Sequence, residues 1–336
     1  MPTVGIIANP ASGKDIRRLV AHGSVFDNNE KVNILRRVLL ALDAVGVRRA
    51  LFMPDYYGLG VRALDGLKVS LEAVFLDMPV LANDQDSTEA ARRLQDMGAG
   101  CIITLGGDGT NRAVAKGCGA IPLVPISTGT NNVFPYMIEG TVAGLAAGLV
   151  AAQAVDVERV AFNTKRLEVR ADGQLVDIAL IDVVVCTDLF IGSRALWDPA
   201  RIREMVLARA QPGSIGLSAV GSCLHPVDAR DGTGMYVQLG EGGSRVLAPI
   251  APGLIVPVAI HHYRLLSLGD EVVLNSGPCT VALDGERSLE IGRHQHLTVR
   301  LTNQGPRVVD IGACMAEAAR ADVFRTPHPI PPLHGG

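Results

Sequence analysis

The stretch from Cys101 to Asn111 constrains the fold of this chain more than any other part of the sequence. An apolar strand pattern ends abruptly at Gly106-Gly107-Asp108-Gly109-Thr110, and a helical pattern follows as far as Lys116. Glycines carry no Cβ, so the backbone can turn tightly there and approach a ligand closely. Amide N–H groups at a strand-to-helix turn can bind phosphate, helped by the helix dipole. Taken alone, the turn fits two interpretations equally: phosphate chemistry with Asp108 as base or magnesium partner, or a tight turn with local hydrogen bonds.

Two further polar turns follow apolar strands. Asn9-Pro10-Ala11-Ser12-Gly13 comes after residues 4–8, and Ser127-Thr128-Gly129-Thr130-Asn131-Asn132 comes after residues 121–126. The first resembles half a P-loop, but Ala8 replaces its first glycine and Asp15 follows Lys14, so a Walker-type NTPase is not expected. Strand and helix patterns alternate as far as residue 150, which predicts a doubly wound α/β domain. Such sheets bind ligands at the carboxyl ends of their strands, so the three turns predict one site.

The second half of the chain has a different pattern, with short strands separated by turns. Residues 166–170 and 174–186 flank Asp172-Gly173, which is a hairpin signal. Residues 198–210 fit a helix. In the first half, the polar residues 22–33 are interpreted as a loop over the site or a solvated connection, before a helix that begins at Asn33.

Three parts are expected from these patterns. Residues 1–150 would form a doubly wound α/β domain, and residues 151–311 a β-rich domain. Residues 312–336 would form a terminal helix and tail.

Composition excludes several classes of function. The net charge of −3 and the pI of about 6.2 do not suit a surface that binds polyanions. Aromatic residues make up 4% of the chain, too few for a platform that stacks single-stranded nucleic acid. The longest apolar stretch, residues 246–260, contains three prolines and is too short to span a bilayer. Six cysteines without a C-x-x-C pair predict mostly buried, reduced thiols, so we expect a cytoplasmic protein. From the charge, the aromatic content and the apolar stretches, we expect it to bind neither nucleic acid nor membrane.

Four motifs together resemble the superfamily of NAD kinases, diacylglycerol kinases and sphingosine kinases. Their order is Asn9-Pro10-x-Ser12-Gly13, Gly106-Gly107-Asp108-Gly109-Thr110, Thr128-Gly129-Thr130-Asn131-Asn132 and Asp284-Gly285-Glu286. Residues 7–15 and 22–26 look most like the acetoin-catabolism protein X family, which is similar to NAD kinase. The resemblance implies an N-terminal Rossmann-like domain, a C-terminal β-sandwich domain and ATP in the cleft between them. It also implies that the last helix packs back on the first domain.

The resemblance assigns roles to individual residues. Asp108 would be the catalytic residue, as the base or magnesium partner that acts on the acceptor hydroxyl. Nucleotide and phosphate binding would come from Asn9, Ser12, Gly13, Gly106, Gly107, Gly109, Thr110, Thr128, Gly129, Thr130 and Asn131. Substrate contacts would come from Asn132, Asp182, Asp284 and Glu286. ATP and Mg²⁺ are the expected cofactors, NAD is a candidate substrate, and no metal ligand is assigned.

Two departures from NAD kinases concern the substrate. NAD kinases carry Ala-Leu-Asn-Asp/Glu before an apolar strand, whereas this chain has Ala179-Leu180-Ile181-Asp182. Ile181 cannot replace the amide's hydrogen bond, and a lost partner costs about 1–3 kcal/mol. The Thr-Ala-Tyr stretch of NAD kinases is not recognisable here, and we interpret residues 213–218 as its remnant.

The sequence therefore leaves more than one function open. The first is an ATP-dependent small-molecule kinase that phosphorylates a hydroxyl, with NAD and a link to acetoin catabolism to be tested. The second is a regulator that binds a nucleotide or dinucleotide and has no kinase activity. A lipid kinase is a third, although no amphipathic membrane helix is evident. We also expect a homo-oligomer, either a dimer or a tetramer.

Overall fold

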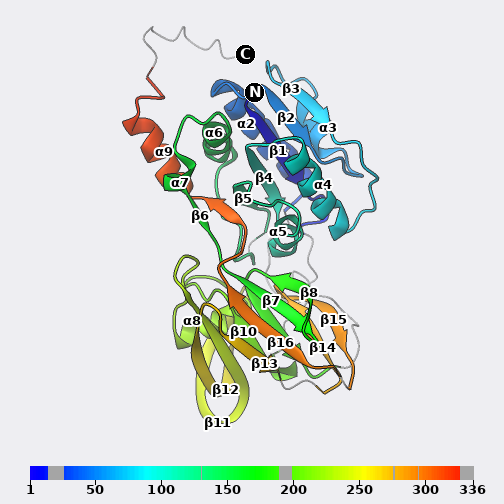
Figure 1. Ribbon diagram of the computed structural model, residues 1–336, viewed down its shortest axis with the longest axis vertical. Coiled ribbons are helices and arrows are strands. Elements are labelled where there is room, and N and C mark those ends of the chain that lie inside the picture. The colour runs from blue at the N-terminus through cyan, green and yellow to red at the C-terminus, as the bar shows by residue number, and fades with distance from the viewer. Residues whose placement is uncertain (14–25, 130, 189–198, 275–276, 294, 326–336) are drawn as a thin grey trace.

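Parallel strands form the centre of the first half of the chain. The computed structural model describes residues 1–13, 26–129, 131–188, 199–274, 277–293 and 295–325 (Figure 1). The first sheet has the order β3 (Glu72–Phe75), β2 (Arg49–Phe52), β1 (Thr3–Ala8), β4 (Cys101–Gly106), β5 (Leu123–Ser127), β17 (Arg307–Val309) and β6 (Ala161–Asn163). Strands β3 to β5 in that order pair in parallel. Every residue of β1 and β4 is buried, which explains their unbroken apolar sequences.

Helices cover both faces of this sheet, as Figure 1 shows. The helices of this part are α2 (Asn28–Ala44), α3 (Leu59–Leu64), α4 (Asp84–Asp96), α5 (Asp108–Ala115) and α6 (Gly140–Ala151). Leu35 and Leu39 of α2 share one core with Ile6 of β1 and with α6. Leu94 of α4 packs with Ile7 on the opposite face. The predicted doubly wound α/β architecture is confirmed.

The end of the chain returns to this first sheet. β17 pairs in parallel with β5 and antiparallel with β6, so both strands extend the sheet beyond β5. The short α7 (Val157–Val160) precedes β6, and α9 (Ile311–Arg320) follows β17. Cys314 of α9 donates its Sγ–H to the Ala146 carbonyl of α6, 3.7 Å away. Residues between β6 and β17 thus form a second unit that is inserted into the first (Figure 1).

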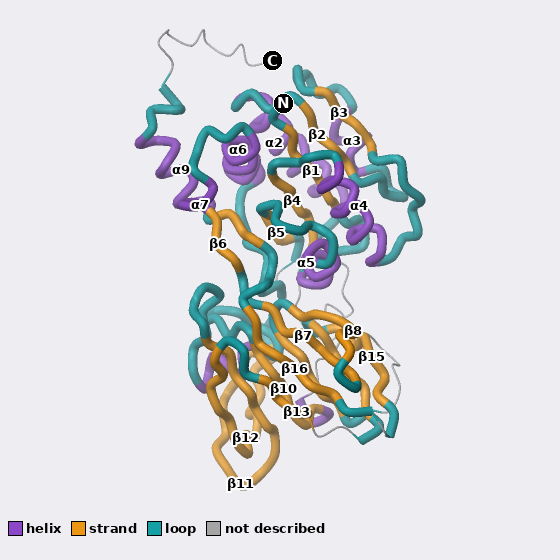
Figure 2. Tube along the Cα trace, in the orientation of Figure 1, coloured by secondary structure: helices purple, strands orange, loops and turns teal. Residues whose placement is uncertain are grey.

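The second unit is a sandwich of two antiparallel sheets, which Figure 2 shows in the lower half of the molecule. The six-stranded sheet has the order β12 (Leu254–Ser267), β11 (Thr233–Ala251), β10 (Ile202–Leu207), β9 (Asp182–Cys186), β14 (Cys279–Leu283) and β15 (Glu286–Ile291). The four-stranded sheet has the order β13 (Glu271–Leu274), β16 (Leu297–Thr302), β7 (Arg166–Ala171) and β8 (Gln174–Ala179). Alternate residues from both sheets, such as Val169, Val185 and Val299, form the core between them. The predicted β-sandwich is confirmed.

Three local predictions can be compared with the described elements. The hairpin at Asp172-Gly173 is confirmed: both residues have positive φ angles, 49° and 81°, and they join β7 to β8. The helix predicted over residues 198–210 is wrong, since a 3₁₀ turn (Pro199–Arg201) leads into β10 there. β10 lies between β9 and β11, and pairing on both sides outweighs the local helical pattern.

The polar segment before Asn33 also differs from its prediction where it is described. Residues 28–32 are the first turns of α2, and the Asp27 carboxylate caps this helix by accepting from the Glu30 N–H at 2.8 Å. Residues 22–25 lie outside the described part of the chain. Polar residues can begin a helix when the cap and the inward-facing side chains are satisfied, and Asn28 and Lys31 are both buried here.

The cysteines confirm the expectation of reduced thiols. All six cysteines are free thiols, and five of them are buried, with Cys223 exposed. Among the described helices, none combines the length and the hydropathy that a membrane crossing requires.

Candidate active site

The strand order places the three polar turns around one crevice. β1 and β4 are neighbours at the centre of the sheet, and the chain leaves them in opposite directions, toward β2 and toward β5. Loops that follow two such strands diverge and leave room for a ligand at the carboxyl edge. The turns after β1, β4 and β5 all lie at this edge and bond to one another. Asn9 donates its backbone N–H to the Leu105 carbonyl at 2.9 Å, and Thr128 donates to the Gly106 carbonyl at 3.2 Å.

Side chains of the first turn connect it to the other two. The Asn9 amide donates to the Thr110 hydroxyl at 2.9 Å, and the hydroxyls of Ser12 and Thr128 lie 2.8 Å apart. Gly13 has a φ of +73°, and a Cβ there would overlap the Thr128 carbonyl oxygen. Only glycine fits both the left-handed backbone and this close approach. The predicted residues of the first turn are therefore in direct contact with the turns after β4 and β5.

A buried lysine that the sequence did not reveal supports the first turn. Lys31 of α2 has no exposed surface, and its ammonium donates to the carbonyl oxygens of Asn9 at 2.9 Å and Ser12 at 2.7 Å. It also lies within hydrogen-bond distance of the Pro10 carbonyl and the Asn28 side-chain oxygen. The carbonyls of this turn thus converge on one buried positive charge.

The glycine turn after β4 is shaped by its neighbours. A Cβ on Gly106 would lie 2.5 Å from the Thr110 Cβ, and one on Gly107 would lie 2.9 Å from the Asn132 side-chain oxygen. The Asn132 amide itself donates to the Ser127 hydroxyl at 2.8 Å. A Cβ on Gly109 would lie 3.4 Å from a Glu286 carboxylate oxygen, so the second unit reaches this turn. Gly129 lies in the third turn, whereas Thr130 falls outside the described residues.

Asp108 begins α5 and faces the space between the two units. Its carboxylate accepts from the backbone N–H of Val133 at 3.0 Å and of Phe134 at 2.8 Å. These bonds tie the glycine turn to the loop after β5 and fix the direction of the carboxylate. Phe134 in turn lies under the fully buried Arg209, whose guanidinium carbon is 4.4 Å from the ring centre.

Asp284, the aspartate of the Asp-Gly-Glu motif, fixes the backbone of the second unit where it lines the site. The Asp284 carboxylate accepts from the N–H groups of Leu180 at 2.9 Å and Ile181 at 2.8 Å, and lies 3.6 Å from the Arg112 Nε. Burial raises the pKa of Asp284 to about 6, although Arg112 and the backbone donors act in the opposite direction. Asp182 reciprocates, since its carboxylate accepts from the Gly285 N–H at 3.2 Å.

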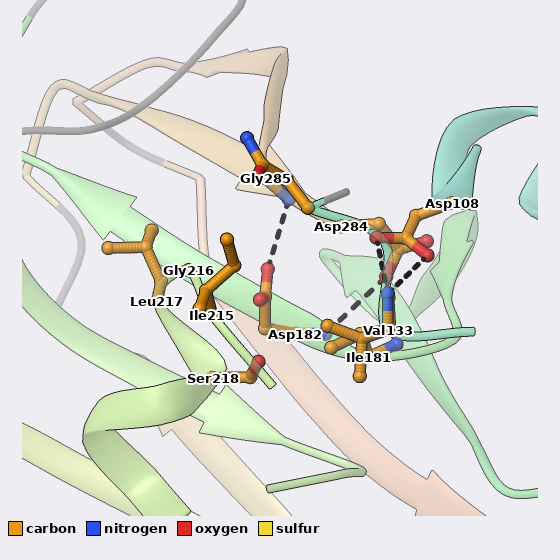
Figure 3. Close-up of a pocket in the computed structure, with 11 residues that line it drawn as sticks. Asp108, Val133, Ile181, Asp182, Ile215, Gly216, Leu217, Ser218, Asp284 and Gly285 are labelled. Carbon is orange, nitrogen blue, oxygen red and sulfur yellow. Dashed lines mark hydrogen bonds between the residues drawn. The ribbon is translucent and has the colours of Figure 1, made fainter. Parts of the chain in front are cut away.

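A small pocket, part of it open to solvent, joins these pieces (Figure 3). Asp108, Asn131 and Val133 line it from the first unit. Lining residues from the second unit are Ile181, Asp182, Ile215, Gly216, Leu217, Ser218, Asp284 and Gly285. Residues 213–218 are interpreted from the sequence as a remnant of a substrate stretch. Of these, residues 215–218, at the start of α8 (Ser218–Leu224), form one wall of this pocket.

An ion-pair network fixes the two units across the pocket's edge. Asp177 of β8 accepts from Arg112 at 3.3 Å and from Lys116 at 2.6 Å, and both cations follow the glycine turn. Helix α5 is therefore bound to the second unit through charges at its C-terminal half, while its first residue faces the pocket.

The site offers backbone and carboxylate groups to the cofactors that the resemblance implies. Gly106 and Gly107 are required by close packing, because a Cβ there would meet Thr110 or Asn132, and a backbone without side chains also suits close approach of phosphate. Within the described residues, no three His, Cys, Asp or Glu side chains converge to hold a metal ion. Mg²⁺ commonly uses one or two carboxylates together with phosphate oxygens, so Asp108 and Asp182 fit such an ion only with a nucleotide present.

Comparisons with known proteins give the chain its family. The family model of the ATP-NAD kinase N-terminal domain matches residues 4–154, and that of the acetoin catabolism protein X C-terminal domain matches residues 165–304. Acetoin catabolism protein X from Cupriavidus necator is 42% identical over 97% of this chain and 94% of its own length. The chain belongs to the acetoin catabolism protein X family. A solved structure of yeast NADH kinase complexed with NADH matches over 99% of this chain and 90% of that one, with 12% identity and a TM-score of 0.49.

Several cations of this family member were missed in the sequence. Lys31, Arg112 and Arg209 carry no motif, and each is buried by contacts between residues far apart in the chain. Burial lowers the pKa of Arg209, against the charges of Tyr136 and Asp108. In the sequence, the only signal for these buried cations was a basic residue within a strongly apolar or turn-forming segment. That signal does not show which groups the side chain contacts.

Proposed function

We propose that this protein transfers a phosphoryl group from ATP to a hydroxyl group of a small molecule. One observation carries the proposal: Asp108, at the glycine turn, faces a pocket that both units line, beside the three turns that can hold phosphate. A nucleotide on the turns and an acceptor in the pocket would meet at this carboxylate. The family's match to the ATP-NAD kinase N-terminal domain supports the same reading.

The proposed reaction depends on position and charge. Phosphoryl transfer requires in-line placement of donor and acceptor and neutralisation of the phosphate charge. Amides of the glycine turns would hold the phosphates, and Asp108 would orient the acceptor hydroxyl and take its proton. Mg²⁺, when bound with the nucleotide, would neutralise part of the phosphate charge beside Asp108 and Asp182.

An ADP-release assay tests this proposal. Purified protein with ATP and Mg²⁺ is supplied with NAD, NADH, small hydroxy-metabolites and diacylglycerol in turn, and both ADP and the phosphorylated product are measured. Acceptor-dependent ADP release with a matching product supports the kinase. Silence across the panel contradicts it.

A second function is favoured by Ile181. This residue is 1% exposed and stands where NAD kinases carry an asparagine, so the chain can have kept nucleotide binding without transfer. A regulator that binds a nucleotide or dinucleotide would then show calorimetric binding of ATP or NAD and no product with any acceptor.

The setting of the reaction is also proposed. Six free cysteines fit the reducing cytoplasm, where ATP is available. The relative's name suggests a role connected with acetoin catabolism. A homo-oligomer, dimer or tetramer, is the assembly that we propose, and light scattering of the purified protein measures it.

A further inference from the structure

Arg209 is a buried cation with unused hydrogen-bond donors. It lies in the second unit, in the loop after β10, and is 1% exposed. Its Nε and Nη2 atoms have no hydrogen-bond partner among the residues that the structure describes. Buried polar groups are nearly always hydrogen-bonded, and an unpaired charge inside a protein destabilises the fold. A gain in stability therefore does not explain an arginine at this position.

The backbone on both sides of Arg209 is fixed beside the pocket. The Ala208 N–H donates to the Ile181 carbonyl at 2.8 Å, and the Ala210 N–H donates to the Val227 carbonyl at 3.0 Å. Ile181 itself lines the pocket. The second unit thus presents the Arg209 side chain from a defined point next to the site.

The Arg209 side chain contacts the first unit at Phe134. The guanidinium carbon lies 4.4 Å from the centre of the Phe134 ring, and both side chains are fully buried. A cation over the face of an aromatic ring is attracted to it, and the attraction is stronger where water is excluded. This contact therefore holds the Phe134 ring against the second unit.

Phe134 is one of the two residues whose backbone fixes the direction of the Asp108 carboxylate. The N–H of Phe134 donates to this carboxylate at 2.8 Å, and the N–H of Val133 donates at 3.0 Å (Figure 3). Two residues later the loop is anchored to β5, because the Tyr136 N–H donates to the Pro125 carbonyl at 3.0 Å. A shift of the Phe134 ring would turn its N–H away from Asp108, since the loop is fixed just beyond it.

Nearby charges stabilise the Arg209 cation without directing it. Burial lowers the pKa of Arg209, and the charges of Tyr136, Asp108 and Asp284 act in the opposite direction. Asp108 and Asp284 both line the pocket. The cation thus belongs to the electrostatic environment of the site, and the ring of Phe134 determines where the guanidinium lies.

We infer that Arg209 is a positioning residue, which acts through the ring of Phe134 to hold the Asp108 carboxylate toward the pocket. The inference rests on the proposed function and adds to it a residue of the second unit that acts on a carboxylate of the first. A buried cation without hydrogen bonds lowers stability, and such a residue can be retained because activity requires it.

Arg209→Met separates positioning from a structural role, because it removes the charge and keeps an unbranched side chain. We expect an unchanged or raised Tm, a KM for ATP within about threefold of wild type, and a kcat lowered by more than about tenfold. Arg209→Lys keeps a charge over the ring and should restore part of the lost kcat. Arg203→Met, at an exposed position of β10, is the control and should change none of these quantities. A lowered Tm or an unchanged kcat in Arg209→Met overturns the inference.

A double-mutant cycle tests whether Arg209 acts through the ring. Phe134→Leu removes the ring and keeps both the apolar character and the backbone N–H. It should lower kcat by about as much as Arg209→Met, and the double variant should lose no more than either single one, because both changes break the same contact. Losses that multiply would show that the two residues act independently, which contradicts the inference.

A spectroscopic measurement decides the inference even if no acceptor is phosphorylated, so its failure is distinguishable from failure of the kinase. Labelling with ¹⁵N-phenylalanine gives signals from seven residues, and Phe134→Leu assigns the signal of Phe134 by its loss. Hydrogen bonds from N–H groups to carboxylates are strong and move the amide proton downfield. Arg209→Met should move the Phe134 amide proton upfield, in the same direction as Asp108→Asn, whereas Arg203→Met should not move it. An unmoved signal in Arg209→Met overturns the inference.

Discussion

Lys31→Met removes the charge that holds the first turn and keeps the length of the side chain. Lys31 is fully buried and donates to the carbonyls of Asn9 at 2.9 Å and Ser12 at 2.7 Å, and to the Asn28 oxygen at 3.1 Å. Each buried acceptor left without a donor costs about 1–3 kcal/mol, and relief of the buried charge offsets part of this. We expect a net loss of roughly 3–5 kcal/mol.

The turn should also lose its shape, because its carbonyls would rotate to find water. Thermal unfolding followed by circular dichroism should show a Tm lowered by roughly 5–15 °C. Isothermal titration should show that the Kd for ATP rises by more than about tenfold at a temperature where the variant is folded. Lys68→Met, at an exposed position, is the control and should change neither quantity. A variant with unaltered Tm and unaltered ATP affinity would refute the reasoning.

Two further predictions concern the turns and the late aspartate. Gly13→Ala should raise the KM for ATP, because its Cβ meets the Thr128 carbonyl, whereas Gly46→Ala has a similar positive φ and open space and should leave the KM unchanged. An equal rise in the KM for ATP in both variants would contradict the explanation by a steric clash. Burial raises the pKa of Asp284 from 3.8 to about 6, so the native state holds this proton more tightly than the unfolded state between these pH values. The free energy of unfolding should therefore decrease as the pH rises across that window. Urea titrations of Asp284→Asn should show no such decrease. An identical pH dependence in both proteins would contradict the assignment.

Much of the fold follows from local patterns in the sequence. Continuous apolar runs such as residues 101–105 belong to strands buried on both faces, and the turn at Asp172-Gly173 needs two positive φ angles, which these residue types tolerate. The return of β17 to the first sheet has no such local pattern, because it depends on pairing with β5 across most of the chain.

The errors have the same physical origin. Residues 202–207 fit a helix locally and become β10 because β9 and β11 offer pairing on both sides. Residues 28–32 look like a solvated loop because they are polar, yet Asn28 and Lys31 face inward to polar partners. A periodic pattern in the sequence shows which positions are apolar. It does not show that a polar side chain will be buried against a polar partner.

The candidate site divides in a similar way. The positions of the turns could be predicted from glycines and hydroxyl residues at the strand ends, because those residue types are needed where backbones approach each other. The sequence could not show that the Asp284 carboxylate is engaged by the N–H groups of Leu180 and Ile181, or that Arg112 lies beside it. Those contacts join residues that are far apart in the sequence, and they exist only in the folded chain.

Single-turnover transfer from γ-labelled ATP measures the central claim, the role of Asp108, most directly. The Asp108→Asn variant keeps the size of the side chain and removes the base, while Asp96→Asn, at an exposed position of α4, controls for the substitution. The acceptor is the best one found for the wild-type protein, and ATP affinity is measured in parallel by calorimetry. The account predicts that Asp108→Asn binds ATP within about threefold of wild type and transfers phosphate at least about a hundredfold more slowly, the lower end of what a general base contributes. Transfer at the wild-type rate by Asp108→Asn would contradict it.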